Sequence, residues 1–275
     1  MSHIERQTTD DDIAIVTLTR PERRNALSNR TLDQLHGVVD EIAADPAIRV
    51  VVITGEGVGF CAGADMKAGP EDMADLETPL GTLLERTQGQ IARTFMSQEL
   101  MASLFEKIHR LRQPVIAAVT GAAHGGGFAL ACDIRFASES ASFGAVFIKR
   151  GVSACDMGTS YHLPRLVGAS RSAELLLTGR VFDAAEARDM GLVLDVVPDG
   201  EVVDRALVTA RQIAANGPLA VWMTKETMWQ TVDSSSLRHA LDLENRTQIM
   251  CTATGELTRA FEAFREGREP EWGPL

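Results

Sequence analysis

Residues 122–133 read Ala-Ala-His-Gly-Gly-Gly-Phe-Ala-Leu-Ala-Cys-Asp, and they form a predicted strand-to-helix corner. The apolar run before it, residues 113–121, is typical of a buried strand, and residues 128–132 continue as a buried helix. Three glycines at such a corner let the backbone approach a ligand closely, with N–H groups directed outward at the start of the helix. The corner suits an anion, or an oxygen that becomes an anion during a reaction. A plain tight turn is the alternative that the triplet alone leaves open.

A second strand-to-loop corner repeats this pattern earlier in the chain. The apolar residues 50–55 run into Glu-Gly-Val-Gly-Phe-Cys-Ala-Gly-Ala-Asp at 56–65. The loop is rich in glycine and small residues, and Asp65 at its end is a residue type that caps helices. Two such corners are able to direct one backbone N–H each at the same oxygen.

Together, the two corners resemble those of the crotonase (enoyl-CoA hydratase/isomerase) superfamily, in which two loops form an oxyanion hole. Further matches follow in order along almost the whole chain, at residues 16–27, 163–168, 174–180 and 184–193. The resemblance implies an α/β fold of the ClpP/crotonase type, a spiral of ββα units that carries the acyl-CoA site over residues 1–200. The sequence becomes fully helical from Glu201. Residues 201–275 are therefore expected to be the helical region that assembles this family into homotrimers, often paired as hexamers.

Hydrophobic periodicity predicts the elements around the corners. Ser28 is a good N-cap for a helix, across which Leu27 and Leu32 are placed to pack, and Asp45-Pro46 ends that helix. Short strands are predicted at 13–18, 134–138 and 192–197, and helices at 171–178 and 184–190.

The segment between Asp65 and Gln113 is longer than in comparable relatives. Residues 69–93 are polar, with several acids, prolines and glycines, and predict a solvated surface loop. The alternative is a lid over the acyl chain, because the segment leaves directly from one of the corners. From Ser97 onward, apolar residues at helical spacing predict a helix that packs on the core.

Composition excludes several functional classes. The chain has 275 residues, 45% of them hydrophobic, and its formal net charge of −11 argues against a nucleic-acid partner. Four scattered cysteines show no spacing typical of zinc or redox sites, and no other metal-ligand pattern occurs. The N-terminus lacks the charged-then-apolar pattern of a signal peptide, and no apolar run is long enough to span a bilayer. We therefore expect a cytoplasmic protein with no membrane partner and no metal.

The resemblance places the ligand-binding residues on the two corners. The N–H groups of Ala64 and Gly126 should donate hydrogen bonds to the thioester oxygen. These bonds become stronger as negative charge develops on that oxygen. Coenzyme A enters as part of an acyl-CoA substrate rather than as a permanently bound cofactor. The residues expected to contact it are Arg24, Ala26, Ala62, Ala64, Asp65, Met66, Lys67, Gly125 and Gly126.

The sequence departs from enoyl-CoA hydratases at their two catalytic glutamates. Ala129 stands two residues after the glycine triplet, where those relatives have the first glutamate, and Phe147 stands near the second. The remaining acid is Asp156, in a loop where relatives that shift double bonds in dienoyl-CoA, and one that displaces halide from an aromatic acyl-CoA, carry an aspartate. We expect Asp156 to transfer protons, and an apolar acyl pocket would make it a stronger base. Capping of the following helix is the alternative.

Other candidates are less specific. His124, directly before the triplet, is expected to pack or to make a backbone contact rather than to take part in catalysis. Cys155 has no neighbour in sequence that would activate a thiolate. Tyr161 and His162 are expected on the helix after the Asp156 loop, in structural roles.

These observations predict an acyl-CoA-processing enzyme of the enoyl-CoA hydratase/isomerase family that stabilises a thioester enolate. Because one acid/base group remains, isomerisation fits better than hydration. The alternative is a catalytically inactive acyl-CoA-binding protein on the same fold, since the corner loops also bind a ground-state thioester. A ClpP-like serine protease would need a serine with a nearby histidine and aspartate, and no stretch presents that arrangement.

Overall fold

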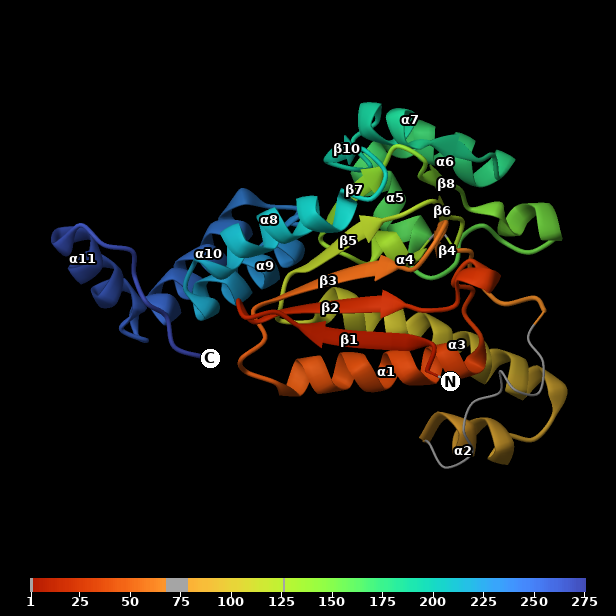
Figure 1. Cartoon of the computed structure of the whole chain (residues 1–275), viewed down its shortest axis with the longest axis horizontal. Coiled ribbons are helices and arrows are strands. Elements are labelled where there is room, and N and C mark those ends of the chain that lie inside the picture. Colours follow the sequence, from red (N-terminus) through yellow and green to blue (C-terminus); the bar gives the residue numbers. More distant parts are fainter. Residues whose placement is uncertain (1, 68–78, 126) are drawn as a thin grey trace.

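A six-stranded sheet lies at the centre of the computed structural model, which describes residues 2–67, 79–125 and 127–275 (Figure 1). Its strands follow the order β1-β2-β3-β5-β7-β10. Their bounds are β1 Ile4–Thr8, β2 Ile13–Leu18, β3 Val50–Gly55, β5 Val115–Val119, β7 Ile134–Ser138 and β10 Asp195–Val197. The first two pair antiparallel and all other neighbours pair parallel. The strands predicted at 13–18, 50–55 and 134–138 are confirmed, whereas the last strand begins three residues later than predicted.

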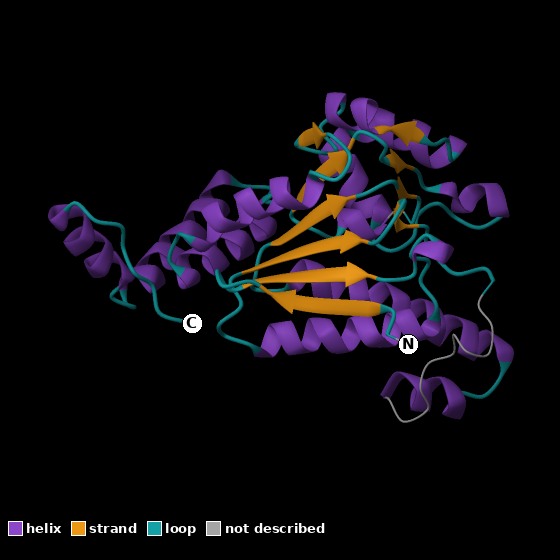
Figure 2. Cartoon of the chain, in the orientation of Figure 1, coloured by secondary structure: helices purple, strands orange, loops and turns teal. Residues whose placement is uncertain are grey.

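A smaller four-stranded sheet continues from one end of the large one (Figure 2). It contains β4 (Gly59–Cys61), β6 (Ala122–Ala123), β8 (Ser142–Phe143) and β9 (Phe182–Asp183) in that order. The strand β4 follows β3 and β6 follows β5, and the two pair in parallel with Gly59 opposite Ala122 and Cys61 opposite Ala123. This pairing brings together the two glycine-rich corners.

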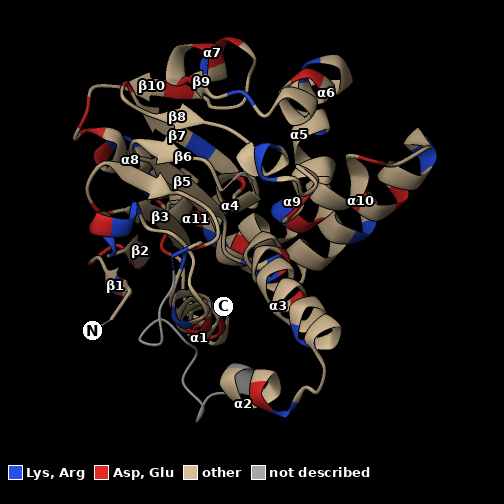
Figure 3. Ribbon diagram, turned by 90° about the vertical axis from the view of Figure 1, so that its right-hand side faces the viewer, with Lys and Arg blue, Asp and Glu red and all other residues tan. Residues whose placement is uncertain are grey.

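The two faces of the large sheet are covered by different helices. On one face, α1 (Asn29–Ala44) and α3 (Gln90–Arg110) pack on alternate strand residues such as Val51 and Ile53. On the other face, α8 (Val202–Ala214) covers the intervening residues, among them Val50 and Val52. This alternation is what a period-two pattern of strand side chains requires. The strands β3 and β5 carry no charged residue, and charges gather on the helices and loops (Figure 3).

The first helix begins as predicted. The Ser28 side chain accepts a hydrogen bond from the Thr31 N–H at 3.2 Å, and Leu27 and Leu32 are both buried. The helix ends at Ala44 with Asp45 as its C-cap.

Short helices surround the smaller sheet. They are α4 (Gly127–Leu130), α5 (Thr159–Val167), α6 (Ala169–Thr178) and α7 (Ala184–Asp189). The helices predicted at 171–178 and 184–190 are therefore confirmed, the first starting two residues earlier and the second ending one residue earlier.

The chain ends in three helices, which are α9 (Pro218–Thr231), α10 (Leu237–Thr252) and α11 (Glu256–Glu266). Of these, α9 packs on the core, and the last two, α10 and α11, extend away from the sheets (Figure 1). The helix α10 has no buried residue. The preceding helix α8 shares its apolar core with the sheet. No helix in the described ranges is both long and apolar enough to cross a bilayer.

The surface-loop prediction for residues 69–93 is wrong for residues 79–86 and 90–93, which are helical. Residues 79–86 form α2 (Pro79–Arg86), and α3 starts at Gln90, seven residues before the predicted start at Ser97. Proline is favoured at the first position of a helix because its missing N–H would have no intrahelical partner there. No proline or glycine interrupts residues 90–110, so the helix continues beyond the part that the core buries. The rest of the predicted lid or loop, residues 69–78, lies outside the described residues.

Candidate active site

The two glycine-rich corners meet backbone to backbone. The N–H groups of His124 and Gly125 both donate to the Cys61 carbonyl, at 3.0 and 3.2 Å. A Cβ atom on Gly125 would lie 2.9 Å from both the Cα and the N of Gly63. Glycine is therefore required at Gly125, because any side chain would push the two loops apart.

A third segment fixes the loop that contains Ala64. The Leu27 N–H donates to the Gly63 carbonyl at 2.8 Å, and the Asp65 N–H donates to the Leu27 carbonyl at 2.9 Å. Gly63 itself adopts a positive φ of 94°. Within the described part of the chain, the Ala64 N–H between these two bonds donates to no acceptor. A half-buried N–H in a fixed loop is available to a ligand.

The glycine triplet is described except for Gly126, so this predicted donor lies outside the described residues. The Gly125 N–H is engaged with Cys61, and Gly127 begins α4. A Cβ on Gly127 would lie 2.2 Å from the Met157 carbonyl oxygen, so the last glycine of the triplet touches the segment that contains Asp156.

The Asp156 side chain is half-buried beside this contact. Its Oδ1 accepts hydrogen bonds from the Met157 N–H at 2.7 Å and from Gln98 Nε2 at 2.5 Å. The capping alternative is wrong for the carboxylate, because α5 has Gly158 at its N-cap and no side-chain cap. It is the Asp156 backbone carbonyl that accepts from the Thr159 N–H, at 2.9 Å. Sequence reasoning missed Gln98, which lies 58 residues earlier with no motif around it.

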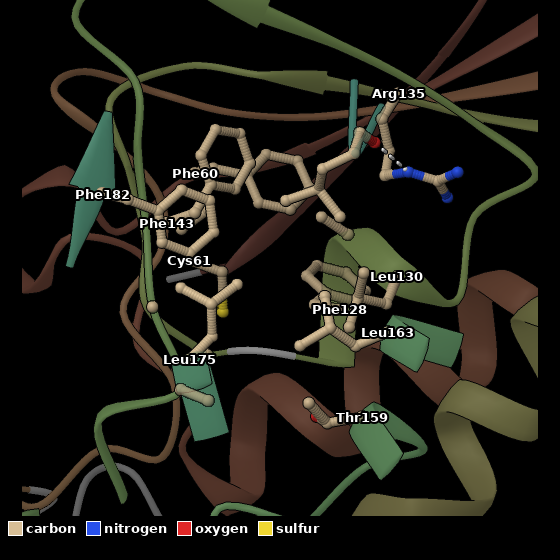
Figure 4. Close-up of a pocket in the computed structure, with 16 residues that line it drawn as sticks. Phe60, Cys61, Phe128, Leu130, Arg135, Phe143, Thr159, Leu163, Leu175 and Phe182 are labelled. Atoms are coloured by element: carbon tan, nitrogen blue, oxygen red, sulfur yellow. Dashed lines mark hydrogen bonds between the residues drawn. The ribbon is translucent and has the colours of Figure 1, made fainter. Parts of the chain in front are cut away.

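The positions of the two missing glutamates are apolar. Ala129 is buried and lines a cavity of about 30 Å³. Figure 4 shows the aromatic and aliphatic side chains that surround the cavity, with Arg135 as the one charged residue among them. The Phe147 ring lies 3.4 Å from where a Cβ on Gly63 would be, so it covers the corner loop. Neither position supplies a proton-transfer group.

The predicted coenzyme A segments lie side by side. The Ala62 N–H donates to the Arg24 carbonyl at 3.0 Å, which joins the segment of Arg24 and Ala26 to that of residues 62–67. Arg24, Met66 and Lys67 are exposed, while Ala26 is buried.

The Asp65 carboxylate has a structural partner that the sequence did not reveal. Asp65 Oδ2 lies 3.0 Å from Arg20 Nη1, and both side chains are at most 6% exposed. Asp65 Oδ1 accepts the Lys67 N–H at 2.9 Å, so this carboxylate fixes its own loop rather than capping a helix. Removal of one partner of such a buried pair typically destabilises a protein by about 3–5 kcal/mol.

The histidines near the site are held in structural contacts. His124 Nε2 lies 3.0 Å from Ser142 Oγ, and burial, with the nearby Arg24, lowers its pKa. His162 is buried against the rings of His109 and Trp229, and burial together with His109 lowers its pKa to about 4. Both structural predictions agree with these contacts.

Two of the cysteines, Cys61 and Cys132, are buried. Burial raises the pKa of Cys61, and likewise that of Cys132, to about 12, so both stay thiols. Across residues 2–67, 79–125 and 127–275, no group of three or more His, Cys, Asp or Glu side chains is placed to hold a metal ion.

Known proteins match this chain over nearly its whole length. The family model described as enoyl-CoA hydratase/isomerase matches residues 8–80 and 81–274. A protein of Mycobacterium bovis named probable enoyl-CoA hydratase echA12 is 38% identical over 94% of this chain and 88% of its own. The crystal structure of an enoyl-CoA hydratase from Bacillus anthracis superposes with a TM-score of 0.86 at 32% identity, covering 98% of both chains. A probable enoyl-CoA hydratase/isomerase from Mycobacterium abscessus gives 0.84 at 34% identity, also over 98% of both. The predicted crotonase-type α/β fold is confirmed.

Proposed function

Because this chain belongs to the enoyl-CoA hydratase/isomerase family, we propose that it binds an unsaturated acyl-CoA and stabilises its enolate. The thioester oxygen would accept hydrogen bonds from the N–H groups of Ala64 and Gly126. The observation that carries this proposal is the contact between Gly63 and Gly125, which joins the two corner loops around an Ala64 N–H without a described acceptor. Preorganised donors of this kind strengthen as negative charge develops on the oxygen.

The reaction that fits these residues best is double-bond isomerisation. Asp156 would take a proton from C2 of a 3-enoyl thioester while the electron pair moves into the carbonyl to form the enolate. Return of that proton to C4 gives the 2-enoyl thioester and restores the carboxylate. One acid/base group suffices for this sequence. Addition of water in hydratases uses two glutamates, and here those positions hold Ala129 and Phe147.

The rest of the substrate would lie along the two joined segments. The proposed coenzyme A contacts are those expected from the resemblance: Arg24, Ala26, Ala62, Ala64, Asp65, Met66, Lys67, Gly125 and Gly126. For Asp65 the contact would come from the backbone, because its carboxylate is paired with Arg20.

We also propose that residues 201–275 assemble the chain into homotrimers or hexamers. Large apolar side chains are exposed on its last two helices, among them Leu237, Ile249 and Phe264. An exposed apolar face of this kind is typical of a surface that a partner subunit covers.

The proposal is tested by the Asp156→Asn variant, with a 3-enoyl-CoA in deuterated water. Wild type should convert it to the conjugated 2-enoyl-CoA, and the variant should be about 100- to 10,000-fold slower, as is usual when a general acid/base is lost. Its affinity for acyl-CoA should change little, because Asn has the same size and shape. Full turnover by Asp156→Asn would refute the role of Asp156.

Absence of the two glutamates favours a second candidate, an acyl-CoA-binding protein without turnover. It would be supported if wild type binds 3-enoyl-CoA and trans-2-enoyl-CoA saturably and converts neither. Rapid loss of the conjugated absorbance of trans-2-enoyl-CoA would instead indicate hydration.

A further inference from the structure

Gln98 of α3 reaches the Asp156 carboxylate from outside the loop that carries it. Its Nε2 donates to Oδ1 at 2.5 Å. The other donor to that oxygen, the Met157 N–H at 2.7 Å, is adjacent in sequence. Among the side chains that the structure describes, Gln98 alone donates a hydrogen bond to this carboxylate.

The two donors leave the carboxylate asymmetric. Both bonds end on Oδ1, whereas no described residue donates to Oδ2. A carboxylate oxygen that already accepts two hydrogen bonds is a poorer proton acceptor than one that accepts none. The two bonds also fix the rotation of the carboxylate, so Oδ2 keeps one direction.

The helix α3 also packs against the glycine corner. Phe105 is buried and its ring packs edge-on to Phe128, with ring centroids 5.6 Å apart. Phe128 belongs to α4, directly after the glycine triplet. Gln98 and Phe105 are seven residues apart, so they lie on the same face of the helix. One face of α3 therefore contacts both the corner that holds the proposed oxyanion donors and the proposed acid/base.

We propose that Gln98 is a positioning residue that holds Asp156 with Oδ2 free for proton transfer, an inference that rests on the proposed function. Gln98 does not touch the reacting atoms. Its amide is neutral, so it orients the carboxylate without adding a charge to the site. Because small misplacements of a catalytic group cost about 100-fold in rate, a single oriented bond is sufficient to matter.

The test compares Gln98→Leu with wild type in the isomerisation assay. Leucine keeps most of the bulk of the side chain and removes the donor. We expect kcat to fall about 10- to 100-fold, as for loss of a group that orients a catalytic residue, with KM within about threefold. Gln98 is exposed, so thermal unfolding should change little. The matched control is Glu99→Gln, an exposed neighbour on the same helix that should keep wild-type kcat.

A double-mutant cycle separates positioning from a general structural role. If Gln98 acts through Asp156, then Gln98→Leu should have no further effect on the residual rate of Asp156→Asn. A loss of equal size in both backgrounds would overturn the inference, and so would a Gln98→Leu variant with wild-type kcat while Asp156→Asn is slow. If Asp156→Asn itself keeps full turnover, the proposed role of Asp156 is refuted, and the inference about Gln98 is refuted as well.

Discussion

The two sides of the candidate site are held together in different ways. On one side, the corner loops after β3 and β5 are joined by backbone hydrogen bonds, and Gly63 and Gly125 approach so closely that no Cβ fits between them. On the other side, Asp156 is held by one neighbouring N–H and by the side chain of Gln98. The first side depends on the absence of side chains, and the second depends on the presence of particular ones. Substitutions on the first side should therefore cause a large loss of activity at once, whereas substitutions on the second side should reduce activity in smaller steps.

The contact between Gly127 and Met157 joins the two sides, and breaking it should have the largest effect. A Cβ in Gly127→Ala would lie 2.2 Å from the Met157 carbonyl and 2.4 Å from its Cβ, so the glycine corner and the Asp156 loop must separate. Loss of one oxyanion donor typically lowers the rate about 100- to 1000-fold. We expect a larger loss of activity here, because both sides of the site shift. Overpacking should also destabilise the fold by about 1–3 kcal/mol. Steady-state kinetics and urea unfolding measure the two effects. A variant with near-normal activity would show that the contact between Gly127 and Met157 is not needed for catalysis.

Gly125→Ala should damage the first side alone. Its Cβ would meet the backbone of Gly63 at 2.9 Å and would displace the loop that carries the Ala64 N–H. We expect a rate loss of about 100- to 1000-fold, the usual effect of removing one such donor. The control is Gly37→Ala in α1, where nothing lies within 4 Å of the new Cβ. That variant should keep full activity and gain about 0.4–1 kcal/mol of stability. Equal activity of the two alanine variants would contradict the proposed oxyanion loops.

The same difference explains which features the sequence predicts and which it does not. The strands, the Ser28 cap and the two corners depend on residues that are neighbours in the chain, so local patterns of sequence indicate them. The helix at 79–86 and the first turns of α3 escape prediction because the polar composition of residues 69–93 indicates a loop, and composition alone does not show helical spacing. The Arg20–Asp65 ion pair and the Gln98–Asp156 bond join residues 45 and 58 positions apart. Such tertiary contacts carry no local signal.

The half-buried His109 and the buried His162 make the second side sensitive to pH, which gives the smallest of the three effects. His109 of α3 and His162 of α5 pack with ring centroids 4.8 Å apart, and both also contact Trp229 of α9. Burial lowers the pKa of His162 to about 4, with further contributions from His109, Arg135 and Arg165.

The sign of the resulting pH dependence follows from proton counting. The unfolded chain binds a proton at His162 near pH 6.5, and the folded protein binds it only near pH 4. Between these values the unfolded state holds more protons, so the free energy of unfolding falls as pH decreases from about 6.5 to about 4. The loss attributable to His162 should be about 2–3 kcal/mol. His162→Phe keeps an aromatic ring in the cluster and removes the titrating group, so its stability should fall less over this range in urea titrations. Parallel curves for wild type and His162→Phe would mean that the contact between α3 and α5 does not depend on a neutral His162.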